Sequence, residues 1–339
     1  AAMGLAPLAD QLDGNVAFVA VPAEEYVELE YRERLRQEGQ IRFFGGKQEY
    51  LRLGVLDDID MGMMIHSHAG VRDRHFLINC DSSGFLGKLI RFTGREAHAG
   101  ARPFDGINAL NAAALSLLAI NSQRETFREK DRIRVHPIIT KGGGAVNAIP
   151  NDVRVESYVR GASIDAIVSA NNRINRALAS SAAAMGANVH LQDFPGYCPL
   201  YNDKNLYQLT VDVVKEGFGE EWIQEDTKWG TGCTDMGDIS CVMPTVQPYC
   251  SGACGVGHGS DYGINDPETA LVVSAQYQVL MAEALLSNNA EMAQKVIKEA
   301  DLVYPDKKDY FAAVDKIFLD KKAVTQNEDG TITLDFQNI

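Results

Sequence analysis

The sequence predicts an α/β fold in which a domain with a mixed, mostly parallel sheet is interrupted by a ferredoxin-like βαββαβ insertion. Three observations support this prediction. Residues 15–21 (NVAFVAV) are an apolar run with the length and β-branched content of a buried parallel strand. Residues 84–194 carry expected elements in the order β-α-β-β-α-β. The segments on either side alternate between strand and helix patterns, as in an α/β domain.

The first domain begins with an apolar helical stretch at residues 1–12, which leads into the strand at 15–21. Because this stretch has no capping residue, we expect the domain to be truncated at its N-terminus. A helix with interleaved charges follows at residues 28–38, with its charged face in solvent. A second strand is expected near residues 61–65.

Alternating and helical patterns define the insertion. Its expected elements are, in chain order, a strand at residues 86–92, a helix at 105–120, strands at 132–139 and 152–159, a helix at 163–185 and a strand at 187–192. Turn signals bound the insertion on both sides, at residues 81–84 (DSSG) and 195–196 (PG). The predicted organisation is a first domain made of residues 1–83 and 195–339, split by an inserted domain of residues 84–194.

The second part of the first domain follows the insertion. It is expected to hold a helix at residues 204–216, a strand near 244–248 and a helix at 267–286. Residues 291–339 are predicted to form short helices with a polar tail.

Composition narrows the function. The chain has 339 residues and a net charge of −14, which argues against a nucleic-acid groove and against an anionic membrane surface. No apolar run reaches the length of a membrane span, and no signal sequence opens the chain. The six cysteines, Cys80 among them, do not form a dense framework. We therefore expect reduced thiols and a cytoplasmic location.

Two adjacent carboxylates, Glu24 and Glu25, follow the predicted strand at residues 15–21. The carboxyl ends of strands in open α/β sheets are where ligands bind. Side-by-side carboxylates repel each other, so a partly buried pair needs a cation or a shared proton. A solvated acidic loop is the common alternative, but the position after a strand favours a site.

Three histidines lie in positions that suit metal binding, two at the end of a predicted strand and one in a glycine-rich loop. His66 and His68 end the strand near residues 61–65, and residues two apart on a strand share a face. His258 lies in a glycine-rich loop (GVGHGSD) that lets backbone approach a ligand closely. A carboxylate after one strand, a histidine after another and a histidine in a glycine loop together predict a zinc set.

The sequence contains five further motifs: VPAEE, MIH, GREAHAGARPFDGINAL, GGGAVNAIPND and TDMGDIS. They resemble motifs of the metal-dependent amidohydrolases, the group of aminoacylases, carboxypeptidase-G-type enzymes and aminobenzoyl-glutamate hydrolases. The resemblance extends over most of residues 1–290. It implies a catalytic α/β domain with a two-metal centre, holding zinc or alternatively manganese or cobalt. It also implies that the insertion is a lid that forms a homodimer.

The resemblance carries roles onto individual residues. Glu24 resembles the general base, and Glu25, His66 and His258 resemble metal ligands. His98 resembles a lid histidine that reaches into the site of the partner copy and steadies the oxyanion. The residues that resemble substrate-holding lid residues are Asn147 and Arg160, of which Arg160 would bind the free carboxylate.

The predicted activity is hydrolysis of an amide bond in an N-acyl, N-aminoacyl or aminobenzoyl amino acid or a dipeptide by metal-activated water. In the family, further metal ligands lie upstream of the helix with which this chain begins, so we expect an incomplete centre. Two alternatives stay open. The chain is a non-catalytic homologue that binds a carboxylate ligand or partner, or it is a dimerising scaffold.

Overall fold

Two units make up the fold, because residues 83–199 build their own sheet and separate two parts of the other unit. The computed structural model describes residues 1–69, 74–79, 81–226 and 228–339. Unit 1 comprises Ala1–Ser82 and Leu200–Lys307, and unit 2 comprises Ser83–Pro199 and Lys308–Ile339. The predicted fold class, an α/β domain interrupted by a second α/β domain, is confirmed.

Unit 2 contains the predicted ferredoxin-like sheet. Its strands are β4 (Gly84–Thr93), β5 (Arg134–Val135), β6 (Ile138–Lys141), β7 (Asp152–Gly161) and β8 (Asn188–Pro195). β4 lies between β7 and β8, while β5 and β6 both pair with β7, and all of these pairs are antiparallel. Each of the six elements expected in the insertion is present, with ends shifted by a few residues.

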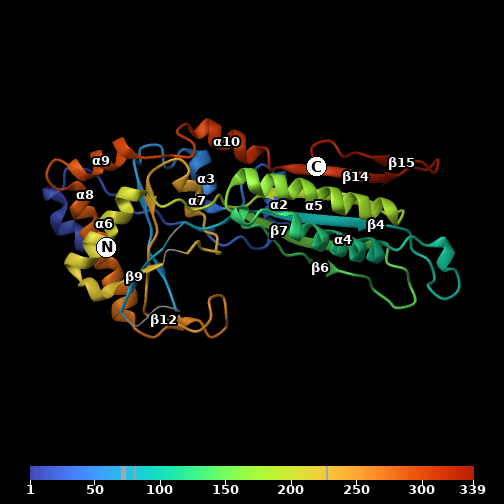
Figure 1. Cartoon of the computed structure of the whole chain (residues 1–339), viewed down its shortest axis with the longest axis horizontal. Coiled ribbons are helices and arrows are strands. Elements are labelled where there is room, and N and C mark those ends of the chain that lie inside the picture. The colour runs from blue at the N-terminus through green and yellow to red at the C-terminus, as the bar shows by residue number, and fades with distance from the viewer. Residues whose placement is uncertain (70–73, 80, 227) are drawn as a thin grey trace. The chain divides into compact units, whose positions relative to one another are not determined.

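Two helices cover one face of this sheet, as Figure 1 shows: α4 (Ala109–Gln123) and α5 (Ile164–Ala184). Both begin at side-chain caps, since Asn108 accepts from the backbone of the first turn of α4 and Ser163 does the same for α5. In β7 the residues alternate between buried and more exposed positions, so the sheet has one face against the helices and one open face. Short 3₁₀ turns occur at η2 (Pro103–Asp105), η3 (Arg124–Thr126) and η4 (Glu129–Asp131).

A buried polar network lies between the sheet and α5. Lys88 on β4 is fully buried and donates to Asp193 on β8, to Asn171 Oδ1 at 2.7 Å and to Asn175 Oδ1 at 2.6 Å. Both asparagines also donate to Asp193 Oδ2, at 2.7 and 2.8 Å. The three protons of the ammonium group and both carboxylate oxygens therefore have partners, which offsets the cost of burying this charge pair.

The C-terminal segment differs from the prediction. The sequence predicts that residues 291–339 form short helices with a polar tail in the first domain. Helices α9 (Glu291–Glu299) and α10 (Lys307–Asp315) are present, but β14 (Leu319–Gln326) and β15 (Ile332–Leu334) form a hairpin. Because β14 pairs antiparallel with β8, residues 308–339 belong to unit 2.

Unit 1 holds short, mostly parallel strand pairs between helices. β2 (His66–Ser67) pairs parallel with β11 (Tyr249–Cys250), β11 pairs antiparallel with β3 (Phe76–Asn79), and β3 pairs parallel with β9 (Ile223–Asp226). The other short strands are β1 (Gly62–Met63), β10 (Thr245–Val246), β12 (Ala253–Cys254) and β13 (Gly263–Ile264). The remaining helical elements of this unit are α1 (Ala2–Leu5), η1 (Ala6–Gln11), α2 (Leu29–Gln37), α3 (Gly46–Leu53), α6 (Lys204–Gly217), η5 (Glu220–Trp222), α7 (Met236–Ser240), η6 (Glu268–Val273) and α8 (Ser274–Leu286).

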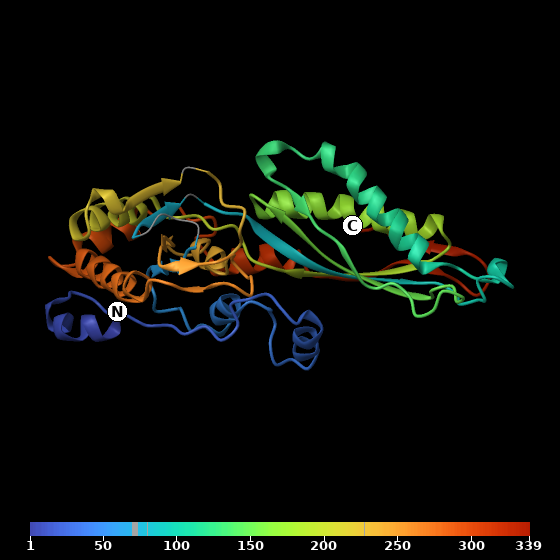
Figure 2. The same ribbon diagram turned by 90° about the horizontal axis from the view of Figure 1, so that it is seen from below.

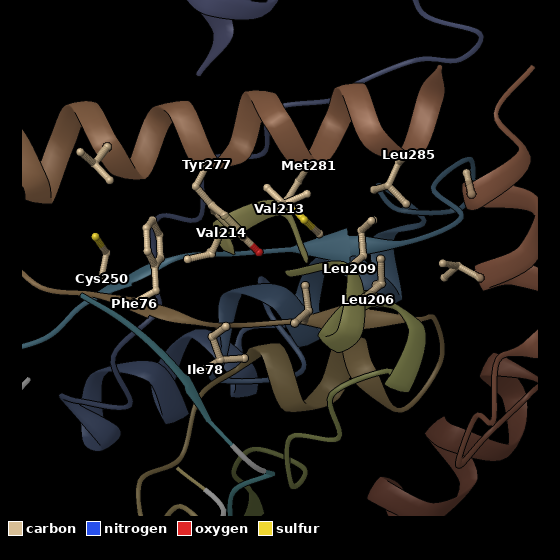
Figure 3. Close-up of a cluster of buried hydrophobic side chains, with 14 of the residues drawn as sticks. Phe76, Ile78, Leu206, Leu209, Val213, Val214, Cys250, Tyr277, Met281 and Leu285 are labelled. Carbon is tan, nitrogen blue, oxygen red and sulfur yellow. The ribbon is translucent and has the colours of Figure 1, made fainter. Parts of the chain in front are cut away.

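The core of unit 1 is built by α6 and α8 against β3 (Figure 3). Tyr277, Met281 and Leu285 recur every four residues along α8 and so share one buried face. Phe76 lies against Tyr277, with ring centroids 5.3 Å apart. Helix and core strand thus bury each other's apolar faces, which is the main stabilising contribution in this unit.

The predicted strand at residues 15–21 is wrong. This stretch is not a strand, and Phe18 is 55% exposed. It runs as a coil between α1 and α2 in Figure 2. A strand requires ladder hydrogen bonds to a neighbour, and in the described ranges residues 15–21 pair with no other strand. The apolar pattern alone therefore does not create the strand.

Among the described residues, one helical stretch, Glu268–Leu286, is long and apolar enough to cross a membrane by length and composition. Core helices pass the same test, and Tyr277 and Met281 of this stretch are fully buried in unit 1. Within the described ranges, no disulfide joins the cysteines Cys198, Cys233, Cys241, Cys250 and Cys254. Cys80 lies outside the described residues.

Candidate active site

Helix α3 holds the segment that carries the two glutamates. The backbone N–H of Gly46 donates to the carbonyl of Ala23 at 2.8 Å, and the Tyr50 hydroxyl donates to the carbonyl of Ala20 at 2.8 Å. A Cβ atom at Gly46 would lie 2.6 Å from Val21 Cγ1, so this close approach requires glycine. Glu24 and Glu25 are therefore positioned by a helix rather than by the predicted strand.

Glu24 lies in a strongly acidic environment. Burial raises its carboxyl pKa above the usual range, and repulsion from Asp235 and then Glu25 raises it further. Lys47 and His66 act in the opposite direction, by attraction. A carboxyl with a raised pKa is the property expected of a general base or acid that works near neutral pH.

A buried ion pair lies close to this glutamate. Lys47 Nζ and Asp235 Oδ1 are 2.5 Å apart, and both side chains are buried. Burial raises the pKa of Asp235, and Lys47 partly offsets that effect. Asp235 Oδ2 is also buried and accepts no hydrogen bond from the described part of the chain. One oxygen of this carboxylate thus lacks the partner that buried acceptors normally have.

Glu25 and His258 lie close to each other. Glu25 Oε1 and His258 Nδ1 are 3.7 Å apart, and both side chains are largely exposed. His258 adopts a φ of 62° in the loop between β12 and β13. Gly255 begins this loop with a φ of 83°, and a Cβ there would lie 2.2 Å from the carbonyl of Asp261. Glycine at this position permits the turn that presents His258.

His66 and His68 lie on β2 and at its end, beside Tyr249 of the paired strand β11. His66 Nδ1 is 2.6 Å from the carbonyl oxygen of Ser67, which can only accept, so Nδ1 donates. When the His66 ring is neutral, this leaves the lone pair on Nε2, the state that a metal ligand needs. Burial and the neighbouring His66 lower the pKa of His68, which favours its neutral form.

The donor types in this region suit a divalent metal, because imidazole and carboxylate are the usual zinc ligands. Few of these candidate ligands lie close to one another. Glu25 and His258 approach each other, whereas the described residues contain no group of three or more His, Cys, Asp or Glu arranged to hold a metal ion. The residue types in unit 1 therefore suit a divalent metal.

In unit 2, His98 and Asn147 lie together just beyond the end of β4. His98 forms a bridge with Ala148, and the N–H of Ala99 donates to the carbonyl of Asn147 at 2.9 Å. His98 Nδ1 accepts from the backbone N–H groups of Gly100 and Ala101 at 3.1 and 3.0 Å. With Nδ1 accepting, a neutral His98 carries its proton on Nε2, where it is available as a donor.

Arg160 lies at the other end of the same sheet. It pairs with Phe85 near the start of β4, whereas Asp152, at the end near His98, pairs with Thr93. A strand rises about 3.3 Å per residue, so Arg160 lies roughly 26 Å from Asp152 along β7. The structure therefore does not bring Arg160 together with Asn147 within one copy of unit 2.

Two residues of this region, Lys47 and Tyr249, have no role predicted from the sequence. Lys47 has no local signal, because its partner Asp235 lies 188 residues further along the chain. Tyr249 contacts both His66 and His68, with ring centroids 5.2 and 5.5 Å away. Burial, and then the charge of Glu24, raise the pKa of its hydroxyl. The TDMGDIS motif was the available signal for Asp235.

Comparison with known proteins identifies relatives of this chain. Residues 81–185 match the peptidase dimerisation domain of the M20 type. The chain is 27% identical over 252 residues to the human (Homo sapiens) Xaa-Arg dipeptidase, covering 73% of this chain and 55% of the relative. It is 28% identical over 187 residues to the indole-3-acetyl-aspartic acid hydrolase of Enterobacter agglomerans, covering 54% and 38%. One component of the p-aminobenzoyl-glutamate hydrolase of Escherichia coli (strain K12) is 31% identical over 147 residues, covering 42% and 33%.

Solved structures share the fold. A Bacillus subtilis protein described as a dinuclear metal-binding peptidase of the M20 family superposes with a TM-score of 0.61 at 18% identity, covering 84% of this chain and 69% of that one. The chain spans about half the length of the two Xaa-Arg dipeptidases that it matches. The resemblance predicted from the sequence motifs is confirmed.

Proposed function

We propose, from the relationship of this chain to the M20 amidohydrolases and metallopeptidases, that it hydrolyses an amide bond in an N-acyl amino acid or a dipeptide. The names of the relatives specify substrates that differ in the amino acid on the amine side of the amide bond. One name specifies a dipeptide ending in arginine, and others specify glutamate or aspartate conjugates. Amide hydrolysis is common to all of them.

The observation that carries this proposal is the environment of Glu24. Its carboxyl pKa is raised by burial and by two neighbouring carboxylates, while the adjacent Glu25 lies 3.7 Å from His258. A structural scaffold has no use for such a concentration of negative charge, because it destabilises the folded state. A site that receives a cation and moves a proton does have a use for it.

Each residue then has a chemical task. Glu25, His66 and His258 would hold a divalent metal, zinc or alternatively manganese or cobalt, which when bound makes water nucleophilic near neutral pH and polarises a carbonyl. Glu24 takes a proton from the attacking water and transfers it to the leaving amine. Arg160 binds the substrate carboxylate through its planar guanidinium.

His98 is suited to stabilise the oxyanion of the tetrahedral intermediate. Its Nδ1 is occupied by two backbone donors, so the neutral ring offers Nε2–H to the oxyanion. Asn147, which lies beside it, adds a side-chain amide donor or acceptor for the substrate.

The roughly 26 Å that separates the two ends of β7 supports a site shared between two copies of the chain. One substrate cannot contact Arg160 and the His98–Asn147 pair of the same unit 2. A homodimer through unit 2 would combine Arg160 of one copy with His98 of the other. The outer strand β6, whose Ile138 is 50% exposed, is available for this pairing.

Metal content tests the proposal directly. The protein is purified without chelator and its bound metal is measured by plasma mass spectrometry, for the unmodified chain, Glu25→Ala and the control Glu216→Ala. Glu216 is an exposed residue of α6 in the same unit. We expect near-stoichiometric metal in the unmodified chain and the control, and its loss in Glu25→Ala. Absence of metal from all three proteins would refute a metal-dependent role for this chain on its own.

A non-catalytic, ligand-binding or scaffold role is the second candidate. It is favoured by the finding that no three-ligand metal group is present in residues 1–69, 74–79, 81–226 and 228–339. This alternative predicts a stable dimer that is insensitive to chelators and to Glu24→Gln. Analytical ultracentrifugation of both proteins, with and without chelator, distinguishes it from the metal-dependent enzyme.

A further inference from the structure

Two arginines face each other on the open side of the unit 2 sheet. Arg134 on β5 pairs directly with Arg160 on β7, and the next pair in register is Val135 with Val159. Both valines are buried against the helices, so the two arginines point to the opposite face. Directly opposed residues in an antiparallel pair have Cβ atoms about 4.5–5.5 Å apart, and like charges in that position repel.

Aromatic rings orient this pair. The Arg160 guanidinium carbon lies 4.4 Å from the centroid of the Tyr158 ring and 5.9 Å from that of Phe85. The His136 ring stacks on Tyr158 in turn, with the two ring centroids 6.0 Å apart. Stacking on aromatic faces fixes the orientation of the planar Arg160 guanidinium.

No carboxylate in the described ranges compensates Arg134. Its one side-chain hydrogen bond there is a 3.3 Å contact from Nη1 to the carbonyl of Ile133, and it takes part in no ion pair within those ranges. The position is unusual, because the chain as a whole carries a net charge of −14. Two arginines held side by side in an acidic protein concentrate positive charge where an anionic ligand would relieve the repulsion.

We propose that Arg134 and Arg160 together select a substrate whose amine half has two carboxylates, an N-acyl glutamate or aspartate. This inference rests on the proposed function and specifies its substrate class. Arg160 binds the α-carboxylate and Arg134 binds the side-chain carboxylate, each through the two N–H groups of a guanidinium edge. The same pair repels a cationic amine half, so a dipeptide ending in arginine is excluded as the preferred substrate.

The test compares two nearly isosteric ligands, N-acetyl-L-glutamate and N-acetyl-L-glutamine, by isothermal titration calorimetry on the full chain. The variants are Arg134→Gln and the control Arg154→Gln, which removes an exposed arginine on the same face of β7. Arg134 is exposed, so its charged hydrogen bond to a ligand is weaker than a buried one would be. We therefore expect about tenfold weaker binding of the glutamate ligand to Arg134→Gln.

The expected pattern has two further parts. The unmodified chain binds the glutamate ligand more tightly than the glutamine ligand, and Arg134→Gln removes that difference while Arg154→Gln preserves it. Equal weakening of both ligands by Arg134→Gln would assign Arg134 to the α-carboxylate and overturn the inference. No change in either ligand, or no binding of either ligand to the unmodified chain, would overturn it as well.

Activity separates this inference from the proposed function. If the protein hydrolyses acyl-glutamate and acyl-glutamine equally well, the proposed function stands and the selection by Arg134 is wrong. If it binds the glutamate ligand selectively but hydrolyses nothing, the selection stands and the hydrolase function is wrong.

Discussion

Removal of the negative charge from the buried network of unit 2 should destabilise that unit severely. Asp193→Asn keeps the shape of the side chain but leaves Lys88 without its charge partner. The two side chains, Lys88 and Asp193, are 0% and 1% exposed, so water cannot replace the lost interaction. Breaking a buried ion pair from one side costs about 3–5 kcal/mol, because an uncompensated charge stays buried. That is a large fraction of the total stability of a typical domain.

The two units can be followed separately during thermal unfolding. Trp222 and Trp229 both lie in unit 1, so tryptophan fluorescence reports on that unit. Far-ultraviolet circular dichroism includes the long helices α4 and α5 of unit 2. For a domain of this size we expect the dichroism transition of Asp193→Asn to fall by roughly 10 °C. The fluorescence transition should move much less.

A matched substitution on the same sheet provides the control. Asp152 also takes part in ion pairs, with Arg91 and Lys141, but these partners are about half exposed. Exposed pairs contribute about 0–1 kcal/mol, so Asp152→Asn should shift the transition only slightly. The assignment of the network as a buried charge pair would be refuted if Asp152→Asn and Asp193→Asn shifted the transition temperature equally. It would also be refuted if Asp193→Asn cost less than about 1 kcal/mol of stability.

Three further predictions concern stability. Burial raises the pKa of the Tyr277 hydroxyl, which hydrogen-bonds to Thr210 at 2.9 Å, so the folded state favours the protonated form and unit 1 loses stability as the pH rises above about 10. In denaturant titrations, Tyr277→Phe should lose less free energy of unfolding between pH 7 and pH 11 than the unmodified chain, and an equal loss contradicts this. Asn108→Ala removes the cap of α4 and should cost about 1 kcal/mol in urea unfolding, whereas no change would show that the cap is dispensable. Lys47→Met leaves the Asp235 carboxylate buried without its cation, so the temperature of the fluorescence transition of unit 1 should fall. The fall should be smaller when Lys47→Met is combined with Asp235→Leu, and a larger fall in this double variant would contradict the ion-pair explanation.

Local patterns predicted the insertion well. Strands such as β7 and helices such as α5 are recognisable through alternation and 3.6-residue periodicity, which depend only on which face is buried. The glutamates and histidines of the candidate site were also recognisable, because motifs preserve their neighbours in sequence. Glu25 and His258, both named from the sequence, lie within 3.7 Å of each other.

Local sequence patterns gave wrong predictions where pairing with a neighbouring strand decided the structure. Residues 15–21 have the composition of a buried strand, yet no described strand pairs with them. The opposite error occurred at β14, where a polar sequence (LDKKAVTQ) forms a strand because the edge of β8 is available. In both cases the hydrogen bonds of a neighbouring strand outweigh the local preference.

By itself, the sequence determined the α/β class, the inserted unit and the candidate residues, since each depends on short-range pattern or motif. Only the tertiary structure decided which of those residues meet. It placed Lys47 against Asp235 and Arg134 opposite Arg160, and it put His98 and Arg160 at opposite ends of one sheet. The reason is physical: contacts between residues far apart in the chain depend on strand register and helix packing, which no local pattern encodes.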